Sequence, residues 1–170
     1  MDIEKYIKVV NDFPKKGVIF KDISPIFLNP RALEKLIDEL AEAVRGYGAT
    51  KMFAAEARGF MFATPLAIKL GMPFVPVRKK GKLPRETFEV SYSLEYGTDT
   101  LCVHKDDVSP SDKILVFDDI LATGGTAKAM CDLAEGLGAE VAGLAFIMEL
   151  SFLKGREFIG GKKIHSMIVE

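Results

Sequence analysis

One stretch, residues 113–126, limits the fold of this chain more than any other. It reads Lys-Ile-Leu-Val-Phe-Asp-Asp-Ile-Leu-Ala-Thr-Gly-Gly-Thr. The apolar run at 114–117, which includes β-branched residues, is typical of a strand buried on both faces, as in a parallel sheet. Beyond Thr126, apolar residues recur at helical spacing and predict a covering helix that ends near Leu137.

The turn within this stretch is suited to bind an anion. The predicted strand leads through a glycine turn into the start of a helix. The first N–H groups of a helix have no hydrogen-bond partners within it, and the helix dipole adds positive charge there. Thr123 and Thr126 add hydroxyl donors. The common nucleotide P-loop is excluded, because no Lys follows the second glycine and the glycine spacing differs.

Two adjacent carboxylates, Asp118 and Asp119, precede this turn. Carboxylates beside a bound phosphate would repel it unless they serve another part of the same ligand. Acids on one side and amide donors on the other suit a phosphorylated sugar, with the acids receiving ribose hydroxyls or a hydrated Mg²⁺. They could also favour positive charge that develops at an anomeric carbon. The ordinary alternative, a strand ending in two solvated acids, fits a bare Asp-Asp pair better than it fits the whole string.

The composition is that of an ordinary globular protein. The 170 residues, 48% hydrophobic and 28% charged, predict one domain with a sizeable core. The formal net charge of −1 gives no overall field that favours nucleic acid or a membrane surface. No apolar run is long enough to span a bilayer, and the charged start lacks the apolar region of a secretory signal. Cys102 and Cys131 are expected to be reduced thiols in a cytoplasmic protein.

Helices and strands are expected to alternate along most of the chain. A short amphipathic helix is expected over residues 3–10. The elements expected after it are a helix capped by Asn29, a strand at 51–55, a helix ending at Gly71, a strand at 74–77, and later strands at 141–148 and 164–169. Pro65 is expected to mark a kink or a first turn. This order predicts an α/β fold with a parallel sheet, and residues 151–163 have no predicted role.

Residues 18–20, Val-Ile-Phe, are strongly apolar for a segment broken by glycine and proline. A short core strand is the interpretation that the sequence alone favours. The alternative is an apolar lid for a flat ring, in which Phe20 stacks and backbone groups read polar edges.

A β-hairpin is expected before the central strand. Phe88, Val90 and Tyr92 alternate with polar residues, which predicts a strand with one polar face, and residues 94–99 read as the turn before a return strand at 100–103. A hairpin inserted at this point has the position of a movable flap.

Basic residues flank the expected sheet at two places. Arg58, between a strand and a helix, could present its guanidinium to an anion, or could be a surface residue. Arg78, Lys79 and Lys82 could neutralise a leaving group such as pyrophosphate, or form a solvated charge run. An RNA-binding patch is a weaker interpretation, because the cluster is short. His104 and His165 have no zinc-ligand spacing.

Residues 116–126 resemble the phosphoribosyl pyrophosphate signature of the type I phosphoribosyltransferases. Further strings at 13–25, 58–60, 78–84, 91–97 and 150–157 are similar in order and spacing to the adenine branch of that family. The string with Glu95 separates the chain from the orotate, hypoxanthine and xanthine branches. The resemblance covers nearly the whole chain, with small departures at Lys21, Ala57 and Arg85.

The resemblance implies a type I phosphoribosyltransferase fold in one domain over residues 1–170. A central parallel sheet would be flanked by helices, with a base-covering hood in 1–30 and a flexible flap hairpin in 79–104. The implied activity transfers the 5-phosphoribosyl group of phosphoribosyl pyrophosphate to adenine, giving AMP and pyrophosphate. Mg²⁺ would be held mainly through substrate and water, and the chain would form a homodimer. A non-catalytic sensor of phosphoribosyl pyrophosphate, or an enzyme for another base, is the alternative.

The resemblance also implies roles for individual residues. The 5′-phosphate would be held by the turn of Ala122, Thr123, Gly124, Gly125 and Thr126, while Asp118 and Asp119 face the ribose. Pyrophosphate would be held by Arg58, Arg78 and Lys79, with Lys82 reaching a neighbouring subunit's site. Ile19 and Phe20 would sandwich adenine, Glu95 would handle a purine proton, and Tyr96 would help close the flap. The Glu56-Ala57 peptide would be cis.

Overall fold

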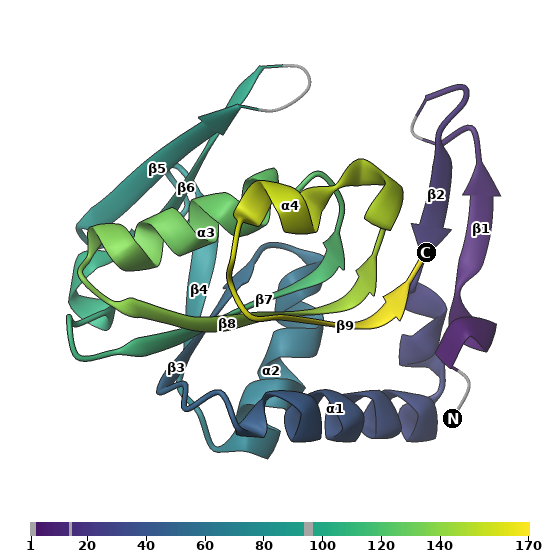
Figure 1. Ribbon diagram of the computed structural model, residues 1–170, viewed down its shortest axis with the longest axis horizontal. Helices are drawn as coiled ribbons and strands as arrows, with labels where there is room; N and C mark the ends of the chain where they lie inside the picture. Colours follow the sequence, from purple (N-terminus) through teal and green to yellow (C-terminus); the bar gives the residue numbers. More distant parts are fainter. Residues whose placement is uncertain (1–2, 14, 94–96) are drawn as a thin grey trace. The chain divides into compact units, whose positions relative to one another are not determined.

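The computed structural model describes residues 3–13, 15–93 and 97–170 (Figure 1). It divides into an N-terminal unit, Met1–Glu39, and a main unit, Leu40–Glu170. The expectation of a single domain stays a prediction.

The N-terminal unit contains a small antiparallel hairpin instead of the helix expected over residues 3–10. A 3-10 turn, η1 (Ile3–Tyr6), leads into β1 (Lys8–Asn11), which pairs with β2 (Ile19–Asp22). The helix prediction is therefore wrong beyond η1, because the β-branched pair at 9–10 favours extended backbone.

Residues 18–20 are partly in a strand, as predicted, but they do not lie in a core. Ile19 is 61% exposed and Val18 41% exposed. Phe20 lies edge-on to Phe13, with ring centroids 5.1 Å apart. The core interpretation of this segment is wrong, because β2 pairs only with β1 in a two-stranded sheet.

The long helix that links the two units is capped as predicted. After η2 (Ser24–Leu28), the Asn29 Oδ1 atom accepts a hydrogen bond from the Ala32 N–H at 3.1 Å. Pro30 occupies the first position of α1 (Pro30–Arg45), where its missing N–H costs nothing.

The main unit is built on a seven-stranded sheet in the order β5-β6-β4-β3-β7-β8-β9. Strands β4, β3, β7, β8 and β9 are parallel, and β6 and β5 add an antiparallel edge. The elements are β3 (Lys51–Ala55), α2 (Arg58–Leu70), β4 (Phe74–Lys79), β5 (Thr87–Ser93), β6 (Thr98–His104), η3 (Lys105–Asp107), β7 (Lys113–Leu121), α3 (Gly125–Gly136), β8 (Glu140–Glu149), η4 (Ser151–Leu153), α4 (Gly155–Ile159) and β9 (Ile164–Val169). The predicted α/β class with a mostly parallel sheet is confirmed.

Helices cover both faces of this sheet (Figure 1). Phe53 and Val116 belong to the core that lies under α3, together with Met130 and Leu133 of that helix. Alternate residues face the other way, and Ala54 lies against the start of α2. Both faces of the central strands are therefore buried, which explains their unbroken apolar runs.

Two local expectations differ from the structure. Strand β7 continues through both acids to Leu121, because Asp118 and Ile120 stay paired with Phe146 and Met148 of β8. The acids thus lie within the strand and not after it. Helix α2 starts at Arg58, so Pro65 lies inside the helix and the first-turn alternative is wrong, while the alternative of a kink stays a prediction.

The predicted hairpin is confirmed, with β5 and β6 paired from Thr87–His104 to Ser93–Thr98. Its base packs on α3, because a Cβ atom added at Gly136 would lie 2.6 Å from the Phe88 ring. Residues 94–96, which include the predicted Glu95 and Tyr96, lie outside the described residues.

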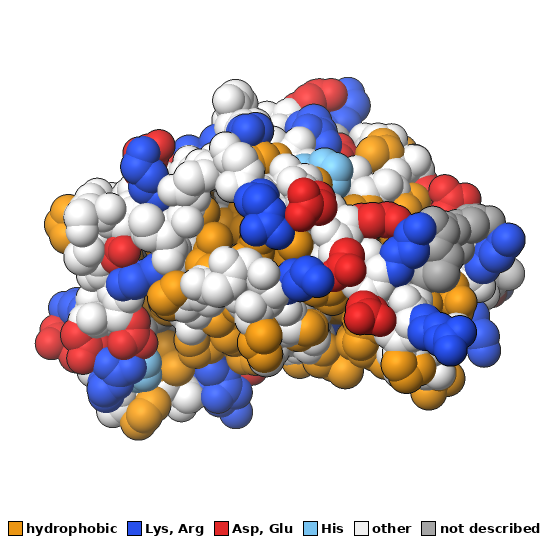
Figure 2. Space-filling view, turned by 90° about the horizontal axis from the view of Figure 1, so that it is seen from below, with side chains coloured by type: hydrophobic (Ala, Val, Ile, Leu, Met, Phe, Trp, Pro, Cys, Tyr) orange, Lys and Arg blue, Asp and Glu red, His pale blue; other side chains and the backbone are white. Residues whose placement is uncertain are grey.

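The surface mixes charge of both signs with apolar side chains. Figure 2 shows Lys and Arg interspersed with Asp and Glu, around exposed hydrophobic side chains. Within the described ranges, no helix is both long and apolar enough to cross a membrane.

We expect Asp112→Asn to lower the free energy of unfolding at pH 7 by about 1–3 kcal/mol, because a charged hydrogen-bond network would lose its acceptor. Burial alone would raise the pKa of Asp112, but the Lys51 ammonium (2.9 Å) and the N–H and hydroxyl of Ser109 outweigh it and lower the pKa to about 2. The contribution of ionised Asp112 is complete above the unfolded pKa and is lost as pH falls toward 2.

Urea unfolding measured between pH 2 and pH 7 checks this expectation. The difference between wild type and Asp112→Asn should shrink steadily below pH 4. A difference that stays constant down to pH 2 would contradict the assigned role of the charge.

Candidate active site

The candidate site lies at the carboxyl edge of the parallel strands. The chain leaves β3 toward β4 on one side, and leaves β7 toward β8 on the other. Strand order therefore reverses between β3 and β7, which is where open α/β sheets bind ligands. The segment after β3 carries Arg58, and the segment after β7 carries the predicted anion turn, residues 122–126. Strand β4 ends in Arg78 and Lys79.

The predicted anion turn has the expected geometry. Gly124 adopts a left-handed φ of 88° and α3 begins at Gly125, with the Lys128 N–H donating to the Gly124 carbonyl at 2.8 Å. The N–H groups before Lys128 have no carbonyl within the helix to bond. A pocket of about 70 Å³ lies here, lined by Asp118, Ile120, Leu121, Ala122, Thr123, Gly124, Gly125, Thr126 and Ala127.

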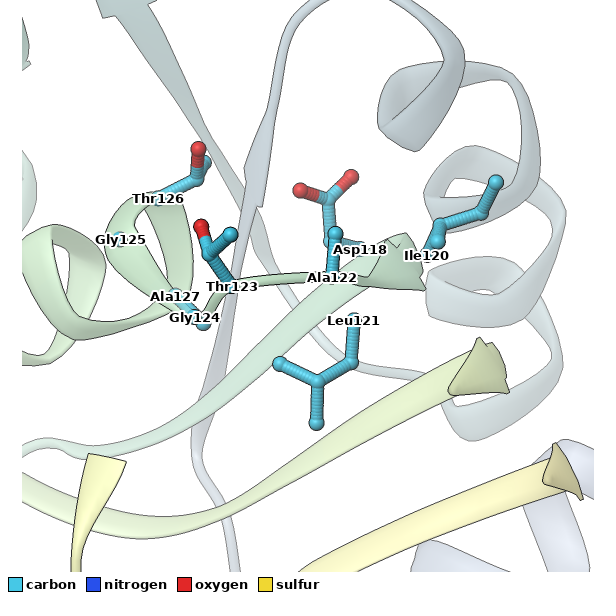
Figure 3. A pocket seen from close by; sticks show the side chains of 9 residues that line it. All are labelled: Asp118, Ile120, Leu121, Ala122, Thr123, Gly124, Gly125, Thr126 and Ala127. Atoms are coloured by element: carbon cyan, nitrogen blue, oxygen red, sulfur yellow. The ribbon is translucent and has the colours of Figure 1, made fainter. Parts of the chain in front are cut away.

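The polar side chains of the pocket point the same way. Figure 3 shows the hydroxyls of Thr123 and Thr126 and the Asp118 carboxylate on one side of the turn, with Leu121 directed to the opposite side. Leu121 is 1% exposed, so it anchors the turn in the core while the polar groups face the pocket.

The two acids of β7 have different surroundings. Asp119 is 6% exposed, and its Oδ2 accepts a hydrogen bond from Arg58 Nε at 2.5 Å. The Asp118 Oδ1 accepts one from the Asp119 N–H at 2.9 Å. Burial raises the pKa of Asp118 well above its usual range, and the neighbouring Asp119 charge raises it further.

Arg58 bridges the point at which the strand order reverses, because it follows β3 and bonds an acid of β7. The next residue, Gly59, leaves room for Asp118, since a Cβ atom there would lie 2.9 Å from Asp118 Oδ1. The start of α2 is thus packed against the acid pair.

The Glu56 carboxylate accepts hydrogen bonds from both basic residues at the end of β4. Its Oε2 accepts from Arg78 Nη2 at 3.0 Å, and its Oε1 accepts from the Lys79 N–H at 2.7 Å. Burial would raise the pKa of Glu56, but these hydrogen bonds outweigh it and the pKa is lowered. The predicted cis Glu56-Ala57 peptide is present. Sequence reasoning missed the role of this carboxylate; its signal was an acid directly after a buried strand.

The remaining basic residues are partly paired. Lys79 Nζ lies 2.9 Å from Asp99 Oδ2 on β6, a partner that sequence reasoning did not identify. Lys82 is exposed, and its carbonyl accepts from Arg78 Nη1 at 3.4 Å. Tyr92 of β5, also missed, has its hydroxyl 3.4 Å from Thr126 Oγ1.

Four of the predicted site residues are not among the described residues of the main unit. Glu95 and Tyr96 lie outside the described residues, and Ile19 and Phe20 belong to the N-terminal unit. Within the part of the chain that the structure describes, no three His, Cys, Asp or Glu side chains form a group that could hold a metal ion.

Comparison with known proteins places this geometry in a family. The family described as "Phosphoribosyl transferase domain" matches residues 26–157. The adenine phosphoribosyltransferase of Carboxydothermus hydrogenoformans is 51% identical over 168 residues, covering 99% of both chains. That of Clostridium botulinum is 47% identical, covering 99% of this chain and 98% of its relative.

Solved structures agree. The adenine phosphoribosyltransferase of Thermoanaerobacter pseudethanolicus superposes with a TM-score of 0.96 at 47% identity, covering 99% of this chain and 98% of that one. The Giardia lamblia enzyme complexed with 9-deazaadenine gives a TM-score of 0.93 at 37% identity, covering 99% and 96%. This chain therefore belongs to the phosphoribosyltransferase family, and within it to the adenine phosphoribosyltransferases.

Proposed function

We propose that this chain transfers the 5-phosphoribosyl group from phosphoribosyl pyrophosphate to adenine, giving AMP and pyrophosphate. The observation that carries the proposal is a single segment, 118–126, that puts an acid pair and an anion turn on one pocket where the strand order reverses. The relatives support adenine as the base, since the Saccharomyces cerevisiae enzyme, 40% identical, has been crystallised with adenine.

The turn would bind the 5′-phosphate. The N–H groups at the start of α3 and the hydroxyls of Thr123 and Thr126 donate hydrogen bonds, and the helix dipole favours the negative charge. Asp118 and Asp119 would accept hydrogen bonds from the ribose hydroxyls. Binding both ends of the sugar phosphate fixes the orientation of C1′ for attack.

Mg²⁺ fits the acids of this site. The Asp118 carboxylate offers hard oxygen ligands, and its raised pKa means that a nearby cation would relieve unfavourable negative charge. A bound Mg²⁺ would neutralise charge on the diphosphate. Because the described residues include no cluster of three ligands, substrate and water would supply most of its coordination.

Cationic side chains would stabilise the leaving pyrophosphate. Arg58, Arg78 and Lys79 lie at or after the carboxyl ends of β3 and β4, and acids of the same unit hold them there. Adenine N9 would attack C1′ as the bond from C1′ to the pyrophosphate oxygen breaks, through an oxocarbenium-like transition state. Ile19 and Phe20 would enclose adenine, Glu95 would take a purine proton, and Tyr96 would close the flap against water.

A cytoplasmic homodimer, in which Lys82 reaches the partner's site, is part of the proposal. Met61 (52% exposed) and Ile68 (78% exposed) on α2 support an interface, because large apolar side chains in contact with water gain from being covered. Both cysteines are free and buried, and burial raises the pKa of Cys131 to about 12. A thiol of this kind suits a reducing compartment.

A non-catalytic sensor of the same fold is not favoured, since full-length relatives at about half identity carry enzyme names.

We expect the protein, given phosphoribosyl pyrophosphate and Mg²⁺, to release pyrophosphate with adenine at a rate at least 100-fold above that with hypoxanthine, guanine or orotate, since hydrogen-bond recognition discriminates strongly. A coupled pyrophosphate assay measures this. Release with none of the bases would leave the sensor as the better interpretation.

We expect Glu95→Gln to lower kcat by about 10²–10⁴-fold, the usual contribution of a general acid or base, while changing the Kd for AMP little. Steady-state kinetics and calorimetry separate the two quantities. The matched control is Glu89→Gln, which removes a carboxylate of β5 that pairs with Lys80. Equal losses in kcat and AMP affinity for Glu95→Gln would mean that Glu95 only binds.

We expect Asp118→Asn to lower turnover and yet raise the unfolding midpoint at pH 7 by a few °C, the scale of about 1 kcal/mol in a chain of this size. Ionised Asp118 is disfavoured in the folded state, because its folded pKa is raised. The contribution of Asp118 to stability therefore falls as pH rises from the unfolded pKa, near 3.9, to the folded pKa.

Thermal unfolding of both proteins between pH 3 and pH 8 provides the measurement. The advantage of Asp118→Asn should be absent at pH 3 and grow with pH. Asp119→Asn is the matched control and should lower stability, because it weakens the charge pair with Arg58. A destabilised Asp118→Asn at pH 7 would refute the expectation.

A further inference from the structure

The anion turn is in contact with the segment 151–163, for which the sequence predicted no role. A Cβ atom added at Gly155, the first residue of α4, would lie 2.2 Å from the Ala122 carbonyl oxygen and 3.1 Å from the Gly124 nitrogen. A Cβ atom added at Gly124 would lie 2.7 Å from the Gly155 carbonyl oxygen. The two backbones are therefore in direct contact, with no side chain between them.

Position 155 requires glycine because a side chain has no room there, and not because the backbone adopts a conformation that favours glycine. Its φ lies outside the left-handed region, so an alanine would suffer no backbone strain there. A methyl group would meet the Leu121 Cδ1 atom at 2.9 Å, which can move, and the backbone atoms of Ala122 and Gly124, which cannot rotate away as a side-chain end can. A methyl group at Gly155 would have to push the anion turn, or be pushed by it.

An ion pair keeps Gly155 in place. The next residue, Arg156, donates from Nε to Glu149 Oε1 at 3.0 Å and from Nη2 to Glu149 Oε2 at 2.5 Å. Glu149 is 4% exposed and also accepts from the Ser166 hydroxyl at 2.6 Å. Arg156 Nη1 donates to the Ile164 carbonyl at 3.1 Å. These bonds tie the start of α4 to β8 and β9, which belong to the same sheet as β7.

We propose that Gly155, fixed by the Arg156–Glu149 pair, is a positioning residue for the 5′-phosphate. It supports the rear of the turn 122–126 so that the N–H groups at the start of α3 stay aimed at the phosphate. The inference rests on the proposed function, because it takes the turn as the phosphate site. Gly155 touches no substrate and acts only through Ala122 and Gly124.

The position of the turn matters because several donors must converge on one phosphate group. Hydrogen bonds weaken steeply when distance and angle depart from their optimum. A displacement of about 1 Å in a group that positions substrate can cost about 100-fold. Adenine is not bound by this turn under the proposed function, so the loss should fall on phosphate-bearing ligands alone.

The test compares Gly155→Ala with Gly46→Ala, whose added Cβ atom meets nothing within 4 Å and whose φ is likewise outside the left-handed region. We expect Gly155→Ala to raise the calorimetric Kd for AMP and the KM for phosphoribosyl pyrophosphate by about 10- to 100-fold. The KM for adenine should stay within about twofold, and the ³¹P resonance of bound AMP should shift. Gly46→Ala should match the wild type in all four measurements.

Two further variants separate positioning from general destabilisation. Ile159→Ala shortens a buried side chain at the C-terminal end of the same helix, α4, and leaves Gly155 unchanged. It should lower the unfolding midpoint and leave the AMP Kd unchanged. Arg156→Lys keeps the charge but loses the two-pronged bond to Glu149, so it should raise the AMP Kd in the same direction as Gly155→Ala. Arg156→Lys carries the test if Gly155→Ala does not fold.

The inference is overturned if Gly155→Ala, or Arg156→Lys in its place, leaves the AMP Kd and the KM for phosphoribosyl pyrophosphate unchanged in an otherwise active background. It is also overturned if the KM for adenine rises by the same factor, or if Ile159→Ala weakens AMP equally. A wild type that neither binds AMP nor releases pyrophosphate would instead refute the proposed function, and this inference with it.

Discussion

The main unit depends on placing two adjacent carboxylates in a central strand of a buried sheet. Asp118 and Asp119 lie in β7, paired to β8 beyond the acids, where ionised groups are costly. Arg58, which follows the neighbouring strand β3, pairs with Asp119, while the Asp119 N–H donates a hydrogen bond to Asp118. Burial and the neighbouring Asp119 charge raise the pKa of Asp118, so its ionised form is disfavoured in the folded state. A site that keeps such an acid in place retains unfavourable charge that a ligand's hydroxyls or a cation can relieve.

Close backbone contacts shape the rest of the edge. Gly59 admits Asp118 beside α2, and Gly124 and Gly155 let the anion turn meet α4. At each place a glycine lets another segment approach more closely than a side chain would allow. The site is therefore held from three directions: by α2, by the core contact of Leu121, and by α4.

Local sequence patterns predicted the helices and strands well where one kind of interaction determines the element. The strands predicted at 51–55 and 164–169 match β3 and β9 residue for residue. β3 reads as a nearly continuous apolar segment because it is buried in the parallel sheet, whereas the partly buried β9 has His165 and Ser166 among its apolar residues. The first strand of the N-terminal hairpin, β1, was missed because a 3.6-residue pattern and a short strand share the same few apolar residues. The extension of β7 past its acids depends on pairing with β8, which no local pattern contains. The partners Glu56–Arg78 and Ala122–Gly155 are distant in sequence, so only the folded sheet reveals them.

Under the proposed function, the same long-range pairs explain how the basic residues would bind a polyanion. Arg58 pairs with Asp119, Arg78 with Glu56, and Lys79 with Asp99. Without these carboxylates, like charges gathered at one edge would repel one another, and their long side chains would sample many rotamers. Acid partners hold the cations near one position, so less side-chain entropy remains to be lost on binding. Under the proposed function, a diphosphate, which carries more charge than any one of these carboxylates, would compete for the same cations, and Asp119 would turn to the ribose or a metal ion.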